Sequence, residues 1–501
     1  MVWLVAALLL AWIAWGPVVL VVAAGLLCIP RLRWWVQDRT DLDRRTAGWV
    51  AGFVVALVGA VLVVPDGWLP IPPAPGVMAG PSYAGRPASA RPVAAEVVTN
   101  PHVAAPDSTT RPGPLGLQPE VETSWLGLQR CGRILPTSRD ALVALCTGRS
   151  GESLRVVDPA SMRPTATRDL PAPGKGGCTT TGFYLDDADR AVVATADRQV
   201  VVVPTAPSGK DAEVDLTTEL GWDLKPWIPY GDCVVDVVPD WPGRLWWVSR
   251  AGLVGTITPE TGAVEVLDLD EAVAHGLAVD GQGVYVVTDA ALHRLEAGAD
   301  GVPRDAWRTE TAGPSGSAPV LVDGGIVAVT DEDDDQLGVV FVARATGEGV
   351  CRQAVFEKGH GATGSDLAPV GSGVVVTNND DYSSPRSTLL GFTSSPGIAR
   401  VDLVDGGCVV QWTNEAASPG SGVTASWPQG LVYAWTKRPS FTGVSAWYLT
   451  AIDVASGRSM WSVRTGTGLL AGSDGSTITL GADGSAWLGT LAGLVRVRDR
   501  S

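Results

Sequence analysis

The stretch Thr450-Ala451-Ile452-Asp453-Val454-Ala455-Ser456-Gly457-Arg458-Ser459-Met460-Trp461 has the pattern of two short strands joined by a tight turn. Alternating residues lead into a Ser-Gly turn, and a tryptophan closes the second strand. Weaker copies of this pattern occur upstream at residues 254–266, 339–351 and 398–412. The recurrence of one strand–turn–strand unit along a chain predicts a repeat architecture.

Eight segments rich in Val, Ala and Trp each follow a turn and end in Thr or Ser. They lie at residues 141–147, 190–195, 244–249, 284–288, 326–330, 374–377, 431–436 and 486–490. Taken as the second strands of four-stranded units, they predict an all-β, eight-bladed β-propeller over residues 121–501. A seven-bladed propeller is the alternative, and a tandem of β-sandwiches is a more distant one. The eighth unit lacks an outer strand, which Ser124–Gln129 would supply by closing the ring.

Residues 1–64 are predicted to form a two-helix transmembrane hairpin. Residues 3–29 and 47–64 are apolar runs long enough to cross a bilayer. The loop between them carries Arg31, Arg33, Arg39, Arg44 and Arg45. By the positive-inside rule, loop 30–46 is cytoplasmic, and the N-terminus and residues 65–501 lie outside. A cleaved signal peptide is the alternative for the first run, which is however too long and lacks a basic start. The expected location is the plasma membrane, with two spans.

Residues 65–120 contain 13 of the 36 prolines of the chain. A segment with this Pro, Ala and Gly content favours extended conformers and does not bury a core of its own. It predicts a linker that lifts the propeller off the membrane as a stalk. An ordered cap on the propeller is the alternative.

The chain has a formal net charge of −16 and a pI of about 4.7. It contains no basic stripe, so nucleic acid is not an expected partner.

Six of the seven cysteines lie beyond residue 120, and an even number outside the cell predicts three disulfides. A turn centred near residues 138–139 places Cys131 and Cys146 opposite each other in the first hairpin, at the Cβ separation that a disulfide needs. The predicted pairs are Cys131–Cys146 from this register, Cys178–Cys233 from matching positions in units two and three, and Cys351–Cys408 by elimination.

The pattern Ala451-x-Asp453-x-x-Ser456-Gly457-x-x-x-Trp461 resembles the repeat of pyrroloquinoline-quinone-type propellers. That superfamily includes quinoprotein alcohol dehydrogenases and the outer-membrane assembly lipoprotein propeller. The outer domain looks more closely like a family of uncharacterised, membrane-anchored bacterial propellers, through residues 182–190, 329–331, 377–380, 411–414, 447–453 and 488–499. This resemblance implies the fold and carries no assigned reaction.

Quinoprotein dehydrogenases typically hold a vicinal disulfide against the cofactor. No two cysteines are adjacent here, so pyrroloquinoline quinone is not an expected cofactor.

In a propeller, the loops from the second to the third strand and the connections between blades open on one face, which is often the binding face. These loops are long in units five to seven, so the polar residues beside them are the site candidates. The ligand-binding candidates are Asp289, Asp331, Asn378, Asn379, Asp380, Asn414, Lys437 and His360. His275 lies on the same face. A structural or exposed role is the competing interpretation for both histidines.

Asp331, Asn378 and Asp380 form a candidate calcium site, because calcium takes carboxylate and amide oxygens as ligands. A solvated acidic loop over residues 331–335 is the competing interpretation.

Because no catalytic motif is recognisable, the leading function is a non-catalytic binding or scaffold module outside the cell. Its expected partner is a protein or a small-molecule or glycan ligand. The alternative is a calcium-dependent hydrolase or lactonase, or a quinone-dependent oxidoreductase, that uses the face formed by blades five to seven.

Overall fold

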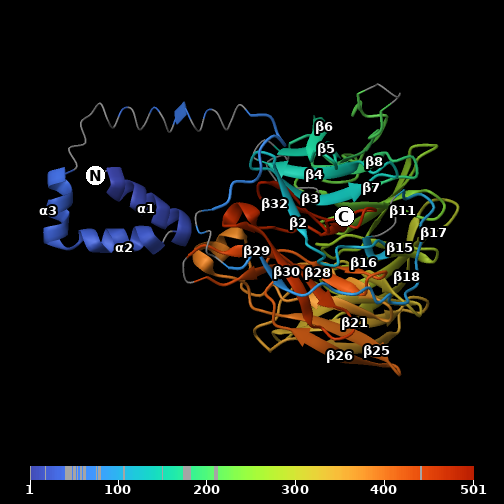
Figure 1. Ribbon diagram of the computed structural model, residues 1–501. Coiled ribbons are helices and arrows are strands. Elements are labelled where there is room, and N and C mark those ends of the chain that lie inside the picture. Colours follow the sequence, from blue (N-terminus) through green and yellow to red (C-terminus); the bar gives the residue numbers. More distant parts are fainter. Residues whose placement is uncertain are drawn as a thin grey trace.

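The computed structural model describes residues 2–39 except 17, positions 48, 52, 55, 56 and 59, and residues 64–500 except 75, 77–79, 105–107, 149–150, 173–181, 208–212 and 441–442. Eight antiparallel sheets follow one another along the chain and surround one axis (Figure 1). This arrangement is an eight-bladed β-propeller, as the repeats predict.

Blades 1 to 4 each contain four strands that pair in chain order. Blade 1 consists of β3 (Arg130–Pro136), β4 (Leu142–Gly148), β5 (Gly151–Asp158) and β6 (Arg163–Asp169). Blade 2 consists of β7 (Phe183–Leu185), β8 (Ala191–Thr195), β9 (Gln199–Val203) and β10 (Leu220–Asp223). Blade 3 consists of β11 (Val234–Pro239), β12 (Leu245–Ser249), β13 (Leu253–Thr258) and β14 (Ala263–Asp268). Blade 4 consists of β15 (Ala278–Asp280), β16 (Gly283–Val287), β17 (Ala291–Ala297) and β18 (Pro303–Glu310).

Blades 5 to 7 repeat this order, and blade 8 supplies three strands from the end of the chain. Blade 5 consists of β19 (Val320–Val322), β20 (Ile326–Asp333), β21 (Gln336–Ala343) and β22 (Gly349–Ala354). Blade 6 consists of β23 (Ala368–Val370), β24 (Gly373–Thr377), β25 (Ile398–Val404) and β26 (Gly407–Asn414). Blade 7 consists of β27 (Val423–Ser426), β28 (Leu431–Arg438), β29 (Ala446–Asp453) and β30 (Ser459–Thr467). Blade 8 consists of β31 (Thr479–Leu480), β32 (Ala486–Thr490) and β33 (Gly493–Arg498).

The ring closes through β2 (Glu120–Trp125), which pairs antiparallel with β33 as the outer strand of blade 8. The register runs from Glu120 opposite Arg498 to Trp125 opposite Gly493. Pairing the two ends of the propeller confirms the predicted closure, although the strand begins four residues before the expected Ser124. Closure leaves β33 without a free edge.

The turn and the tryptophan of the repeat meet between neighbouring blades. Trp412, in the outer strand of blade 6, stacks on Gly457, in the last turn of blade 7, and its indole N–H donates to the Val454 carbonyl at 2.8 Å. Trp307 packs on Gly347 of blade 5 in the same way. Gly457 has φ +68°, and a Cβ there would lie 2.5 Å from the indole ring. The turn therefore requires glycine both for its backbone and for the close approach of the ring.

Two predicted disulfides are confirmed, Cys131–Cys146 and Cys351–Cys408. Cys131 lies directly opposite Cys146 in the β3–β4 pairing, as the register predicts. Cys351 and Cys408 join the outer strands of blades 5 and 6. The third predicted pair contains Cys178, which lies outside the described residues.

The described parts of residues 64–119, which we call the strap, lie against the propeller instead of forming the expected stalk. β1 (Tyr83–Gly85) pairs antiparallel with β30 and becomes the fifth strand of blade 7. The strap then reaches the turns between the first and second strands of several blades. Its hydrogen bonds there include Glu96–Asp323 on blade 5 (2.7 Å), Asn100–Pro239 on blade 3 (2.8 Å), Ala104–Leu185 on blade 2 (3.0 Å) and Thr109–Trp427 on blade 7 (2.8 Å).

The physical reason for this difference is that the propeller supplies the partners that the strap cannot supply to itself. The outer edge of β30 offers unpaired backbone groups to β1, and Ile71 and Ala88 are buried in the cluster formed by blades 7 and 8. Proline content limits what a segment builds alone, but an extended segment still packs on an existing sheet edge.

Three helices precede the strap: α1 (Val2–Trp15), α2 (Val18–Leu27) and α3 (Pro30–Arg39). The first expected span is thus divided at Gly16. This glycine has φ +72°, which ends α1. The following residue in the sequence is a proline, which has no N–H to donate. Among the described residues, no single helix is both long and apolar enough to cross a membrane. The pair Val18–Leu27 and Pro30–Val36 meets these criteria only jointly, across a 100° bend. Most of the second expected span, 47–64, lies outside the described residues.

Candidate functional site

The two faces of the propeller differ in what covers them. The face that carries the turns between first and second strands, which we call the strap face, is lined by the strap. The opposite face, which we call the loop face, carries the loops from second to third strands and the connections between blades. The residues predicted as a site all come from elements on the loop face.

A cavity of about 280 Å³ opens on the loop face between blades 4, 5 and 6. It is lined by His275, Pro314, Ser315, Gly316, Glu332, Leu337, Thr363 and Gly364. Most of these residues directly precede the innermost strands β15, β19 and β23, so the cavity lies close to the propeller axis. Its surface combines hydroxyl groups, backbone, the His275 imidazole and the Glu332 carboxylate with the apolar side chains of Pro314 and Leu337.

Side chains from the ends of second strands hold this lining in place. The Thr330 hydroxyl accepts a hydrogen bond from the Gly316 N–H at 3.0 Å. Asn379 Oδ1 accepts from the Gly364 N–H at 3.1 Å and from the Ser365 hydroxyl at 3.0 Å, and Asn379 Nδ2 donates to the Ser418 carbonyl at 2.9 Å. Both side chains are buried, so their hydrogen bonds fix the backbone of Gly316 and Gly364 in the cavity lining.

Charged groups from separate blades influence one another across the axis. Asp236 of β11 accepts backbone hydrogen bonds from Leu277 (3.0 Å) and Val237 (2.9 Å), and it is buried. Burial raises the pKa of Asp236, whereas Arg133 of blade 1 lowers it and Asp366 of blade 6 raises it further. The Asp236 carboxyl at the axis is therefore subject to the opposed effects of one arginine and one other acidic side chain.

His275 lies between this axial group and the cavity. Its Nε2 is 2.9 Å from the Ser315 carbonyl oxygen, so this nitrogen carries the proton in the neutral ring. Burial lowers the pKa of His275, although Asp366 acts in the opposite direction. The imidazole is therefore neutral at pH 7 and is oriented by the backbone of blade 5.

The opposite side of the axis is covered by the long loop of blade 6. The Tyr382 hydroxyl reaches Asp474 (3.0 Å) and the Ser473 carbonyl (3.2 Å) in the connection between blades 7 and 8. Asp474 in turn forms an ion pair with Arg130 at the start of blade 1. Burial and the neighbouring Asp474 raise the pKa of Tyr382. None of these residues lines the cavity between blades 4, 5 and 6.

The predicted site residues do not form one cluster. Asn378 and Asn379 support the segment beside the cavity, since Asn378 Nδ2 donates to the His360 carbonyl at 2.8 Å and its Oδ1 accepts from the Ala362 N–H at 3.2 Å. Asp380 lies 3.9 Å from the exposed His360 ring. Asp289 is exposed at the end of β16.

Asp331 and Asn414 are engaged in packing between strands. Asp331 is buried and forms an ion pair with Arg352 at 2.8 Å. The expected loop after it is instead a continuation of the β20–β21 hairpin, which turns at Asp334 and Asp335 with φ of +49° and +59°. Asn414 Nδ2 donates to the Gly457 carbonyl at 2.7 Å and so joins blade 6 to blade 7.

The candidate calcium ligands are therefore on two blades and have protein partners. Asp331 binds Arg352, Asn378 binds backbone groups, and Asp380 accepts from the Ser395 hydroxyl at 2.9 Å. Among the described residues, no group of three His, Cys, Asp or Glu side chains is placed to hold a metal ion. The structure gives the calcium hypothesis no ligand set.

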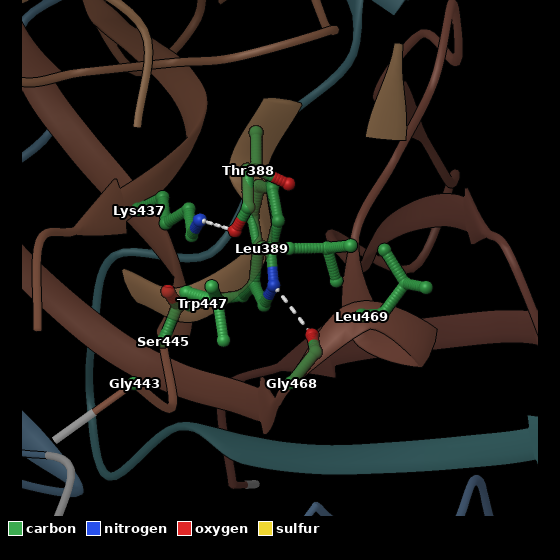
Figure 2. A pocket seen from close by; sticks show the side chains of 9 residues that line it. Thr388, Leu389, Lys437, Gly443, Ser445, Trp447, Gly468 and Leu469 are labelled. Atoms are coloured by element: carbon green, nitrogen blue, oxygen red, sulfur yellow. Dashed lines mark hydrogen bonds between the residues drawn. The ribbon is translucent and has the colours of Figure 1, made fainter. Parts of the chain in front are cut away.

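Lys437 lies in a second, smaller cavity of about 40 Å³ on blade 7 (Figure 2). Its buried ammonium group donates to the carbonyl oxygens of Thr388 and Phe392, in the long loop of blade 6. The ammonium is 5.4 Å from the centre of the Trp447 ring. Burial lowers the pKa of Lys437 to about 7. Its observed role is to hold that loop against blade 7.

Several axial residues were missed by the sequence reasoning. A Ser/Thr-Gly-Ser motif precedes the innermost strand of two successive blades, as Ser315-Gly316-Ser317 and Thr363-Gly364-Ser365, and this repeated signal marks the cavity. Asp236 has no comparable signal, because its neighbours Gly182 and Gly276 come from other blades.

Comparisons with known proteins support the fold. No protein-family model matches the chain. An uncharacterised protein from Archaeoglobus fulgidus is 24% identical over 318 residues, which are 53% of this chain and 61% of that relative. The chain thus spans about three fifths of the length of this curated relative.

Among solved structures, BamB from Moraxella catarrhalis aligns with a TM-score of 0.50 and 11% identity, over 73% of this chain and 95% of that one. A europium-containing methanol dehydrogenase aligns with a TM-score of 0.44 and 11% identity, over 74% and 91%. At 11% identity, the likeness to BamB shows the fold alone.

Proposed function

We propose that the protein is a membrane-tethered propeller outside the cell, which binds a ligand in the loop-face cavity without converting it. The observation that carries this proposal is the asymmetry of the two faces. The strap lies over the turns of the strap face, while the loop face opens a cavity of mixed polar and apolar lining beside the axis. A cavity on the face opposite the strap favours recognition on that face.

The proposed location rests on two features of the chain. Its first 64 residues contain two apolar runs with arginines only between them, which favours two spans and an outer propeller. Cys131–Cys146 and Cys351–Cys408 are bonded, and disulfides persist in oxidising compartments. The break at Gly16 makes the first span a bent one in this proposal.

Binding is favoured over catalysis because the polar groups at the cavity act on the protein itself. The hydroxyl of Thr330 and the amide of Asn379 hold backbone, and His275 Nε2 faces a carbonyl rather than a nucleophile. Hydroxyls and backbone groups beside a neutral imidazole and the Glu332 carboxylate suit a hydroxyl-rich or peptide ligand. The partner is accordingly a glycan, a small polar molecule or a segment of another protein.

Site-specific photo-crosslinking in intact cells tests this proposal. A photoreactive residue replaces Glu332, which lines the cavity and is exposed, and the same residue replaces Asp405 as the control in an exposed turn of blade 6. We expect a discrete adduct from position 332 and none from position 405. Equal labelling at both positions, no adduct at position 332, or robust turnover by the purified chain would overturn the proposal.

A further inference from the structure

Four large apolar side chains are exposed together on the loop face at blade 7, and we call them the apolar rim. They are Leu389 (41% exposed), Leu390 (71%), Phe392 (67%) and Leu469 (38%). Leu389, Leu390 and Phe392 belong to the long loop of blade 6, and Leu469 to the connection between blades 7 and 8. Leu389, Leu390 and Leu469 line the same small cavity, which shows that the two segments adjoin.

The rim is held in a fixed position by the propeller beneath it. Lys437 binds the carbonyl groups of Thr388 and Phe392, on both sides of the exposed leucines. The Gly391 carbonyl accepts from the Ser440 N–H at 3.1 Å. Leu390 has φ +55°, which is uncommon for a residue other than glycine. The protein therefore orders this loop while leaving its apolar side chains in water, and clustered exposed apolar groups of this kind mark an interaction surface.

The charge around the rim differs from that of the whole chain. The chain carries 53 acidic residues and a net charge of −16. Residues 382–398 and 437–452, which build the rim and its support, contain none of them. They contain Arg386 and Arg438, both exposed. The acidic side chains nearest in the structure, Asp380, Asp381 and Asp474, bind Ser395 and Tyr382 of this loop. Apolar tips on a segment that carries arginines and no acidic residue of its own are the composition that binds at the boundary between lipid headgroups and acyl chains.

The strap leaves the expected membrane span beside blades 1 and 8, where Asp66 pairs with Arg155 and the Gly67 N–H donates to the Trp125 carbonyl, and it then reaches this rim. The Thr467 hydroxyl donates to the Ala74 carbonyl at 3.0 Å, and a Cβ on Gly468 would lie 2.3 Å from that of Ala74. Gly468 is thus the point where the strap touches the segment that carries Leu469. Val64, the end of the second expected span, is ten residues before Ala74. Ten residues reach at most about 35 Å.

We infer that the apolar rim lies on the outer surface of the lipid bilayer and makes a second contact with the membrane beside the tether. This inference rests on the proposed tether. The contact turns the loop face, rather than the strap face, towards the membrane. The rim then orients the cavity of blades 4 to 6 relative to the bilayer.

A fluorescent probe that reports depth in the bilayer tests the inference on the full chain in liposomes. Cys28 is the free cysteine among the described residues and is replaced by serine. An NBD group is attached at Leu390→Cys, and separately at Val404→Cys as the control. Val404 is 43% exposed and lies at the turn between β25 and β26. We expect a blue shift of NBD emission at position 390, and loss of its intensity with spin-labelled lipids, but neither at position 404.

The other outcomes separate the inference from the tether on which it rests. If the chain floats with the liposomes but both probes are unquenched, the tether stands and the rim contact is wrong. If the probe at position 390 is blue-shifted equally in detergent and is not quenched by lipid labels, the rim is covered by protein and the inference is overturned. If the chain does not float with liposomes, the tether is wrong and the inference falls with it. The double variant Leu390→Asp/Phe392→Asp is expected to keep the chain afloat while abolishing the quenching of a probe at position 389.

Discussion

Asn379 lies just after the second strand of blade 6, and Lys437 lies near the end of the second strand of blade 7. Both side chains bind backbone groups of loops. Asn379 fixes the cavity lining at Gly364, and Lys437 fixes the loop that carries Phe392. Their positions could be predicted from the sequence, because both come directly after a regular strand pattern. Their roles could not, because the atoms they bind belong to segments whose placement depends on the closed ring. A polar residue after a strand is therefore a marker of the loop face rather than of a ligand site.

Replacing Lys437 with methionine is expected to change how stability depends on pH. The pKa of Lys437 is about 7 in the folded protein and about 10.4 when the side chain is in water. Between these values the unfolded chain binds more protons, so this residue makes the free energy of unfolding rise with pH, by at most about 1.4 kcal/mol per pH unit. Lys437→Met removes that contribution. Urea unfolding at pH 7 and pH 9 should show a smaller rise in the variant than in the parent chain. The same rise in both proteins would mean that the folded pKa is not lowered.

Among the elements of the fold, the strand–turn–strand unit was the one that the sequence predicted best. Its turn glycine and outer tryptophan meet between adjacent blades, at Gly347 with Trp307 and at Gly457 with Trp412. The pattern is local and periodic, so the eight units and the closing strand could be predicted. The strap could not, since its partners lie far away in the sequence, such as Asp323 for Glu96. The length of the β20–β21 hairpin was also missed, because two aspartates at positive φ make a turn without glycine.

Gly457→Ala should destabilise the propeller more than Gly406→Ala. Both glycines have positive φ, of +68° and +78°, so alanine costs about 1–2 kcal/mol of backbone strain at either position. Only at Gly457 does the new Cβ meet the Trp412 ring, which adds about 1–3 kcal/mol for overpacking, since nothing lies within 4 Å of the Cβ position at Gly406. Urea denaturation of the two variants gives the comparison directly. Equal losses would show that the tryptophan moves aside without cost.

Hydrogen exchange should separate an ordered strap from a stalk. The N–H groups of Ala88, Arg91 and Val93 donate to carbonyl oxygens at 2.8–3.0 Å, so we expect slow exchange across this segment. Val97 and Val98 serve as the internal control, because both are exposed and no hydrogen bond of their N–H groups is seen among the described residues. Peptides from the two segments can be compared by mass spectrometry in one experiment. Fast exchange in both would restore the stalk.

At the scale of the whole molecule, the ring, the strap and the disulfides make the propeller one closed unit. β2 and β33 join the two ends of the repeat, and the Asp499 carboxylate accepts hydrogen bonds from the Leu115 and Gly116 N–H groups at 2.6 and 3.0 Å. The strap therefore binds beside the closing strand as well as on blade 7. The N-terminal segment is therefore joined to the blades through these contacts rather than through a flexible linker, so its orientation and that of the propeller are coupled.

The orientation of this unit relative to the membrane is open to a direct test with reporter fusions. Asp41 lies in the arginine-bearing loop, which the sequence places in the cytoplasm. A reporter for the outer side should not be inserted at Gly113, because a Cβ there would lie 2.5 Å from the Tyr433 ring and an insertion would disturb the strap. The turn at Asp405 and Gly406 is a better site, since Gly406 has open space around it. We expect a cytoplasm-active reporter to work at position 41 and an export-dependent reporter to work at position 405. The same compartment for both positions would exclude the hairpin. The propeller and its cavity would stand, but the membrane contact of the apolar rim would lose the tether from which it was argued.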